Sequence, residues 1–290
     1  MENHLYSYSP IIRRPRLHLP HNARVAFWVG VAVEHMPLDQ PGMSLNPSTA
    51  MFKPDPLNTG WRDYGPRVGI WRLMDLFDRS GIRASCLLNS DACTYYPEIV
   101  EEGKKRNWAW IAHGKNNSVR LGTMTREDER VYLTEMTQVI TEATGQQPKG
   151  WLGPALTESF NTPSLLQELG YSYLLDWGCD DQPFSLNVLQ GRLLSVPYSL
   201  EINDSAIYVS KTLPGKEYAQ MLIDQFKVLY AEGADTARVM GLGLHPFISG
   251  QPFRIRYLQE VLAYISQQKD VWLTTSDEIA TWYLNVEAEA

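Results

Sequence analysis

The run RVAFWVGVAVEHM, residues 24–36, decides the fold that we expect for this chain. It is rich in β-branched and aromatic residues and almost unbroken by polar ones, which is typical of a strand covered on both faces. Strands of that kind occur in parallel sheets with helices on either side. The apolar part ends at Glu34, so a carboxylate is expected at the carboxyl end of a buried strand.

Strand-like and helix-like segments alternate along the rest of the chain. After a loop that reaches about Pro66, a helix is expected, and another is predicted from Thr125 to Gly145 by its capping residues. Strands separated by helices of this length indicate βα units. We therefore predict an α/β fold, a distorted (β/α)7-type barrel, in a single domain over residues 24–290, after an N-terminal arm, residues 1–23.

Composition excludes several classes of function. The chain has 290 residues, of which 44% are hydrophobic, and a net charge of −7 with both signs interspersed. The sequence therefore shows no basic patch that would bind nucleic acid or a membrane surface. No segment is apolar enough to span a bilayer. Its three cysteines fit neither a zinc knuckle nor a disulfide scaffold. We expect a cytoplasmic protein that acts on a small-molecule substrate.

Polar or aromatic residues follow the predicted strands at the points where these end. They are Glu34, Asn89, His113, Trp151, Asp176 and His245. In a (β/α) barrel the carboxyl ends of the strands share one rim, where active sites lie. A lone histidine at a strand end is more often structural than catalytic. The convergence of several such positions is what indicates a site.

Five segments, in order, carry a resemblance to a known family. They are VAVEHM, AHGKNNS, KGWLGP, LLDWGCDDQP and GLGLHPF. Their order resembles the motifs of the polysaccharide deacetylase (NodB-homology) family, in particular the branch of metal-independent allantoinases and cyclic imide hydrolases. The resemblance runs from Arg24 to the C-terminal helix. It implies a distorted barrel, a hydrolase of carbon–nitrogen bonds other than peptide bonds, and a homo-oligomer, either a tetramer or a dimer.

The departures from the family pattern point to a different active site. Where the family has two adjacent aspartates, a base and a metal ligand, this chain has Val33 and Glu34. Where it has two histidines, the chain has His113 and Asn117, and Leu152 takes the place of an arginine. Zinc usually takes three or more protein ligands, and Asn117 is a poor third beside Glu34 and His113. No cofactor is therefore expected; one divalent metal such as zinc on these three residues is the alternative.

The resemblance implies metal-free hydrolysis, for which we assign three catalytic residues. Glu34, as a partly buried carboxylate with a raised pKa, would be the general base on water. His113 would orient the base or stabilise the oxyanion, His245 would protonate the leaving nitrogen, and Asn117 would donate to the substrate carbonyl. An imide or ureide opens more readily than an acetamide, because its nitrogen lone pair is shared between two carbonyls. The expected reaction is ring opening of a cyclic amide, imide or ureide.

The substrate-binding residues are expected in the strand-end segments and in PYSLEIND, residues 197–204. They are Asn117, Trp151, Asp176, Trp177, Asp180, Asp181 and Glu201. Loop capping is an equally good interpretation of Asp180 and Asp181. The aromatic residues could stack on a planar ring or on a sugar face, so an N-deacetylase of an N-acetylated sugar or other amide stays as the alternative.

Two further alternatives stay open from the sequence. A non-catalytic barrel-fold binding protein is favoured by the missing base and ligand, and disfavoured by the three ionisable residues kept at the rim. The loop from Pro37 to Pro66 is too long for a plain connector. It either covers the barrel mouth or contacts another subunit.

Overall fold

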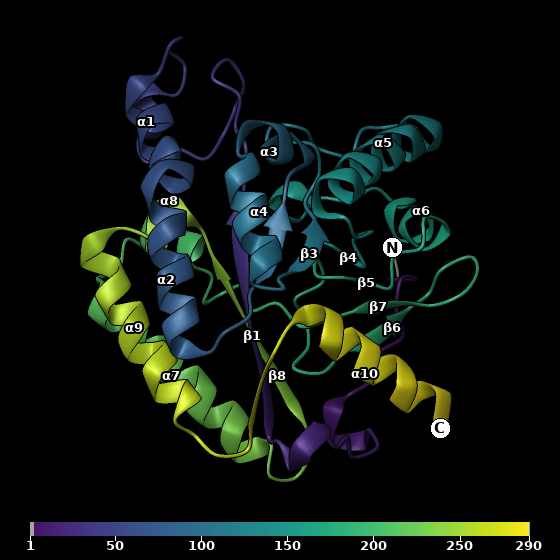
Figure 1. Ribbon diagram of the computed structural model, residues 1–290. Helices are drawn as coiled ribbons and strands as arrows, with labels where there is room; N and C mark the ends of the chain where they lie inside the picture. The colour runs from purple at the N-terminus through teal and green to yellow at the C-terminus, as the bar shows by residue number, and fades with distance from the viewer. Residues whose placement is uncertain (1–2, 290) are drawn as a thin grey trace.

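The computed structural model describes residues 3–289 as a curled, mostly parallel sheet surrounded by helices (Figure 1). Across the nine-stranded sheet the order is β6-β7-β5-β4-β3-β2-β1-β8, and β9 pairs with β1. Among the strands of residues 3–289, only the β6–β7 pairing is antiparallel. The predicted distorted barrel in a single domain is confirmed. The strands are β1 (Val25–Val33), β2 (Ser85–Leu88), β3 (Ala109–Ala112), β4 (Gly150–Trp151), β5 (Tyr173–Leu174), β6 (Phe184–Leu186), β7 (Leu193–Ser195), β8 (Arg238–Leu244) and β9 (Val271–Thr274).

The helices cover the outside of the sheet. Helices α7 and α9 lie side by side with α2 next to α9, and α5 and α6 cover the opposite flank (Figure 1). Among the described residues, none of the helices combines the length and apolar character that a membrane span requires. The α-helices are α1 (Pro56–Tyr64), α2 (Ile70–Ser80), α3 (Ser90–Tyr95), α4 (Pro97–Lys105), α5 (Arg126–Thr144), α6 (Thr162–Glu168), α7 (Gly215–Glu232), α8 (Pro246–Ser249), α9 (Pro252–Ser266) and α10 (Ser276–Glu289).

Strand β1 is buried along its whole length, as the sequence predicts. Its first half pairs with β9 and its second half with β2, while β8 runs along its other edge. Successive side chains of a strand point to opposite faces. Phe27 accordingly belongs to the cluster under the helices, and Trp28 to the cluster inside the curl. This doubly covered strand delivers Glu34 to the carboxyl edge of the sheet.

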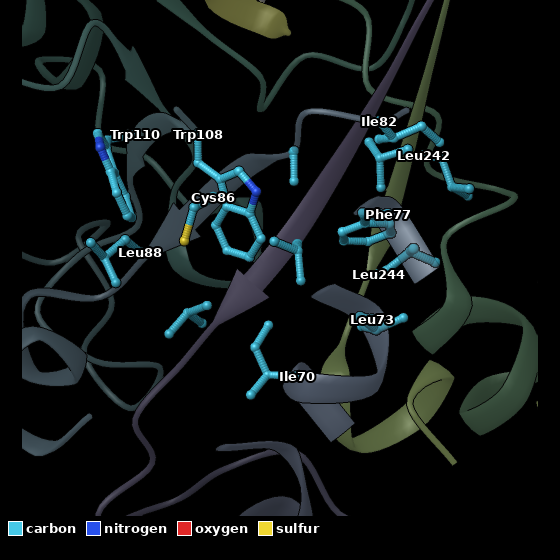
Figure 2. Packing of buried hydrophobic residues seen from close by; sticks show 14 of the residues in the cluster. Ile70, Leu73, Phe77, Ile82, Cys86, Leu88, Trp108, Trp110, Leu242 and Leu244 are labelled. Carbon is cyan, nitrogen blue, oxygen red and sulfur yellow. The ribbon is translucent and has the colours of Figure 1, made fainter. Parts of the chain in front are cut away.

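Helix α2 anchors the helical layer to the sheet. Its apolar face presents Ile70, Leu73 and Phe77, close to Leu242 and Leu244 of β8 (Figure 2). All five side chains are fully buried. Burying each side chain of this kind stabilises the fold by roughly 1.5–3 kcal/mol, so the layer is fixed mainly by apolar burial.

The chain becomes helical earlier than the sequence predicts. Helix α1 starts at Pro56, because Asp55 accepts a hydrogen bond from the backbone N–H of Asn58 at 3.2 Å. A π-helical turn, Gly65–Gly69, then leads directly into α2. Pro66 has no N–H to give to a regular helix, and the wider turn accommodates it. The predicted loop to Pro66 therefore ends at residue 55.

Gly69 contacts the segment that follows β8, and we predict that Gly69→Ala destabilises the protein. A Cβ at Gly69 would lie 2.0 Å from Pro246 O, a backbone atom that cannot rotate away. We expect a loss of about 1–3 kcal/mol in the free energy of unfolding, measured by urea denaturation.

Gly60→Ala in α1 is the matched control, because a Cβ there meets nothing within 4 Å. It should leave stability unchanged or raise it by up to about 1 kcal/mol. Equal effects of the two substitutions would contradict the close packing at Gly69.

Candidate active site

Three strand ends bring Glu34, His113 and His245 together. His113 Nε2 lies 3.2 Å from Glu34 Oε1, and His245 Nε2 lies 3.7 Å from the same oxygen. The three side chains are only 3%, 5% and 10% exposed, in the order Glu34, His113, His245. Residues that are far apart in the sequence thus form one buried ionisable cluster at the carboxyl edge of the sheet.

His113 is held in a defined orientation by the backbone. Its Nδ1 lies 2.6 Å from the carbonyl oxygen of Leu152. A carbonyl only accepts hydrogen bonds, so Nδ1 carries a proton and Nε2 faces Glu34. One proton is therefore held between His113 Nε2 and Glu34 Oε1. The other carboxylate oxygen, Glu34 Oε2, is buried and has no hydrogen-bond partner among residues 3–289.

The pKa of Glu34 is below its usual value, so the expectation of a raised pKa is wrong. Burial by itself raises the pKa of this carboxyl group. The charge of His245 and the hydrogen bond and charge of His113 lower it more strongly. Glu34 is accordingly ionised at neutral pH and can accept a proton through Oε2.

Asp204 holds His245, and no sequence pattern had singled it out for this role. Its Oδ1 lies 2.6 Å from His245 Nδ1, and its Oδ2 accepts from the backbone N–H of His245 at 2.7 Å and from Ser249 Oγ at 2.6 Å. Burial lowers the pKa of His245, but the charges of Asp204 and Glu34 raise it to about 9. His245 therefore carries a proton at neutral pH and turns Nε2–H towards Glu34.

Two asparagine amides complete the polar wall. Asn89 Oδ1 accepts from the backbone N–H of His35 at 2.8 Å. Asn89 Nδ2 must then be the donor to the backbone oxygen of His113 and to Asn117 Oδ1, which is 3.2 Å away. Since the oxygen of Asn117 is used in this contact, its Nδ2 is the donor that it can offer to a substrate.

Of these residues, Glu34, His113, Asn117 and His245 line a cavity of about 390 Å³. That volume suits a small molecule. The long loop after β1 forms part of the wall, so it borders the site directly. The cavity is lined by Ala32, Glu34, Pro41, Gly42, Met43, Leu87, His113, Asn117, Arg120, Leu152, Ala155, Leu156, Tyr198, Asn203, Ser205 and His245.

Trp151 does not fulfil the role that the sequence suggested. It is 0% exposed and belongs to the main apolar cluster. Neighbouring residues of a strand point to opposite faces, so the next residue, Leu152, reaches the cavity while Trp151 points away from it. The prediction that Trp151 binds substrate is wrong, because its ring is packed in the core.

The other predicted substrate-binding residues lie outside the cavity that holds Glu34. Asp176 and Trp177 line a second cavity of about 530 Å³, which shares Leu156 with the first. A third cavity, of about 440 Å³, holds three more of them, Asp180, Asp181 and Glu201. Asp180 is engaged there by Arg14 at 2.6 Å. Of the predicted substrate-binding residues, only Asn117 lines the cavity that holds Glu34.

The residues present do not fit the zinc site of Glu34, His113 and Asn117. Glu34 Oε1 and His113 Nε2 are paired with each other at 3.2 Å, so these two groups are engaged with one another. The oxygen of Asn117 already accepts from Asn89. Over residues 3–289 there is no group of three or more His, Cys, Asp or Glu side chains spaced to hold a metal ion.

Comparison with known proteins supports the fold and the family resemblance. Residues 62–174 match the sequence model of the polysaccharide deacetylase family. This part of the chain is similar to the polysaccharide deacetylases. This confirms the family resemblance that the sequence predicts, and the coarse activity of that family is hydrolysis of a carbon–nitrogen bond.

Individual relatives agree with this family. A Schizosaccharomyces pombe protein that carries the name of a polysaccharide deacetylase is 29% identical over 241 residues, 75% of this chain and 73% of its own. A peptidoglycan deacetylase of Helicobacter pylori is 23% identical over 267 residues, 80% of this chain and 88% of its own. The crystal structure of Puue allantoinase superposes with a TM-score of 0.85 and 27% identity, covering 94% of each chain. The chain is thus similar to deacetylases and to an allantoinase over most of its length.

The charged pair of His245 and Asp204 predicts how the stability of this protein depends on pH. The pKa of His245 is about 9 in the folded protein and 6.5 for an unconstrained histidine. Its proton therefore stabilises the fold fully below pH 6.5, and this contribution is lost as the pH rises through 9. We expect the free energy of unfolding to fall over this range by up to a few kcal/mol.

Urea denaturation of the parent and of Asp204→Asn across the same pH range checks this prediction. The groups of opposite charge that face His245 are Asp204 and Glu34. Removing the charge of Asp204 should lower the pKa of His245 and flatten the decline relative to the parent. Parallel curves for the two proteins would show that this ion pair does not control the pH dependence.

Proposed function

We propose that this protein hydrolyses a carbon–nitrogen bond of a cyclic amide, imide or ureide with water activated by Glu34. One observation carries the proposal: Glu34 Oε2 is a buried acceptor without a partner in the described chain, while Oε1 faces two imidazoles. An ionised carboxylate in this setting is a general base for a water molecule in the cavity.

Each polar group of the cavity has a role in the reaction. The water oxygen attacks the carbonyl carbon as its proton passes to Glu34 Oε2, and the carbonyl electron pair moves to oxygen. Asn117 Nδ2 donates to this oxyanion. The electron pair then re-forms the carbonyl, the carbon–nitrogen bond breaks, and His245 Nε2–H protonates the leaving nitrogen. The ring opens to a carboxyl group and a free N–H, while His113 holds Glu34 in place.

The hydrogen-bond donors of the cavity favour a substrate whose carbon–nitrogen bond is already activated. They offer hydrogen bonds to the carbonyl oxygen, which stabilise an oxyanion less than a strong Lewis acid would. An imide or ureide needs less activation, because its leaving nitrogen shares its lone pair with two carbonyls. The likeness to Puue allantoinase at 27% identity supports the same substrate class. Independence from metal, a cytoplasmic location and a homo-oligomeric state remain predictions from the sequence and the family resemblance.

Deacetylation of an N-acetylated sugar is the second candidate. It is favoured by the names of the sequence relatives, which are deacetylases of polysaccharide and peptidoglycan. The same base and acid would serve, since both reactions are amide hydrolyses. The two candidates differ in the substrate that the cavity admits.

Glu34→Gln tests the base. We expect turnover to fall by about 10²–10⁴-fold with binding of substrate retained, because the amide keeps the shape of the carboxylate and cannot take a proton. Steady-state kinetics and equilibrium binding of the same substrate measure the two effects. Asp277→Asn is the control, since it neutralises a buried carboxyl that is bound to Tyr173 outside the cavity. Unchanged turnover in Glu34→Gln would contradict the assignment.

Chelation tests the metal-free mechanism. The protein is purified without a metal-affinity step, its metal content is measured by mass spectrometry, and allantoin, hydantoin, succinimide, maleimide and a chitin oligomer are assayed before and after chelation. We expect ring opening that survives chelation. About one equivalent of metal, with activity lost on chelation, would contradict the mechanism. Activity on the chitin oligomer alone would favour deacetylation.

A further inference from the structure

One peptide unit connects the catalytic cavity to a second cluster of ionisable groups. The carbonyl of Leu152 accepts from His113 Nδ1 at 2.6 Å, and the N–H of Gly153 donates to Asp176 Oδ1 at 2.8 Å. The two groups belong to the same planar amide, so neither can rotate without the other. Whatever fixes the Gly153 N–H therefore also fixes the acceptor that orients His113.

Asp176 lies beside a second carboxyl group, that of Glu158. A proton on either of these two carboxyl groups would allow a hydrogen bond between them. Burial raises the pKa of both groups, and the neighbouring Glu158 raises that of Asp176 further. Trp177 Nε1 donates to Glu158 Oε2 at 3.2 Å. Asp176 Oδ2 and Glu158 Oε1 are buried and have no hydrogen-bond partner among the described residues.

The turn that follows Gly153 has a backbone conformation that its residues do not favour by themselves. Ala155 and Leu156 have φ values of 56° and 54°, in the left-handed region that costs a non-glycine residue roughly 1 kcal/mol or more. A Cβ at Gly153 would lie 2.5 Å from the carbonyl oxygen of Thr157, so the turn is also tightly closed. A strained turn needs an external contact to keep the Leu152–Gly153 peptide plane in one orientation. The hydrogen bond from Gly153 N–H to Asp176 is such a contact.

We propose that Asp176, backed by Glu158, is a positioning residue that fixes the ring plane of His113 through the Leu152–Gly153 peptide. Asp176 touches neither Glu34 nor the cavity in which the reaction is proposed to occur. Its effect passes through the peptide to His113 Nδ1–H, and Nε2 is thereby directed at Glu34. The inference rests on the function proposed above for its catalytic consequence, but its structural part does not need a substrate.

The main competing role for these residues is ligand binding, because Asp176 and Glu158 also line the second cavity. The two roles make opposite kinetic predictions. Loss of a positioning residue lowers kcat and leaves KM nearly unchanged, whereas loss of a ligand-binding residue raises KM.

The first test is nuclear magnetic resonance of the protein labelled with nitrogen-15 histidine. The His113 signal is assigned by its absence from His113→Gln. We expect the parent and Asp176→Asn to show a proton fixed on His113 Nδ1, because the asparagine oxygen still accepts from Gly153. In Asp176→Ala this proton should exchange rapidly with water. An unchanged His113 signal in Asp176→Ala overturns the proposal, and Asp277→Asn serves as the control for removing a buried carboxyl elsewhere.

Glu158→Ala keeps the test decisive if Asp176→Ala does not fold. Glu158 borders a cavity that water can fill, so its truncation leaves no empty core. We expect faster solvent exchange of the same His113 proton, and exchange at the parental rate overturns the proposal.

The second test uses whichever substrate of the panel is turned over. We expect kcat to fall about tenfold or more in Asp176→Ala, with KM within about twofold of the parent, and Asp176→Asn to recover most of the loss. A raised KM with kcat retained would overturn the proposal in favour of ligand binding. If no panel compound reacts, the proposed function fails while the resonance experiment still decides the positioning role.

Discussion

A carboxylate that is 3% exposed has to be compensated by its neighbours, and the rest of the site follows from this constraint on Glu34. Two imidazoles supply the compensation from opposite strands. Each imidazole in turn needs an acceptor for its far nitrogen: His113 uses the carbonyl of Leu152, and His245 uses Asp204. Glu34 Oε1 is thus paired with both imidazoles, whereas Glu34 Oε2 has no partner among the described residues. Glu34 Oε2 is therefore the atom through which the cluster can accept a proton from a bound molecule.

The register of the sheet explains why these groups meet. Val33 is paired with Leu88, and Leu88 with Ala112, so the next residues along the three strands, Glu34, Asn89 and His113, occupy one layer. Ala112 is paired with Trp151, which puts Leu152 in the same layer. On the other edge of β1, Val31 is paired with Leu244, and His245 follows directly. Parallel pairing places their Cα atoms at fixed spacings, so the site needs no loop to assemble its first members.

The parts of the site that the sequence predicts are those that follow directly from strand patterns. Glu34, His113 and His245 each come at the end of a long apolar run, where periodicity marks both the strand and its end. Asp204 lies 41 residues from His245 in an irregular segment, and no local pattern connects the two. Trp151 was misassigned because the two-residue strand β4 is too short to show which face its side chains take. The lowered pKa of Glu34 depends on distances to two histidines, and only the folded chain contains these distances.

At Leu152 the backbone, rather than the side chain, contributes to the site. The family resemblance places an arginine there, and in this chain an apolar side chain lines the cavity while the backbone carbonyl holds His113. A backbone acceptor is present whatever the side chain, so substitution at Leu152 cannot remove it. Rotation of the peptide plane can, because the carbonyl would then point away from the imidazole. The orientation of this peptide consequently depends on two neighbouring residues. They are Gly153, where a Cβ would meet Thr157, and Asp176, which accepts a hydrogen bond from the Gly153 N–H. In this arrangement the integrity of the site depends on backbone conformation beside Leu152 more than on the identity of residue 152.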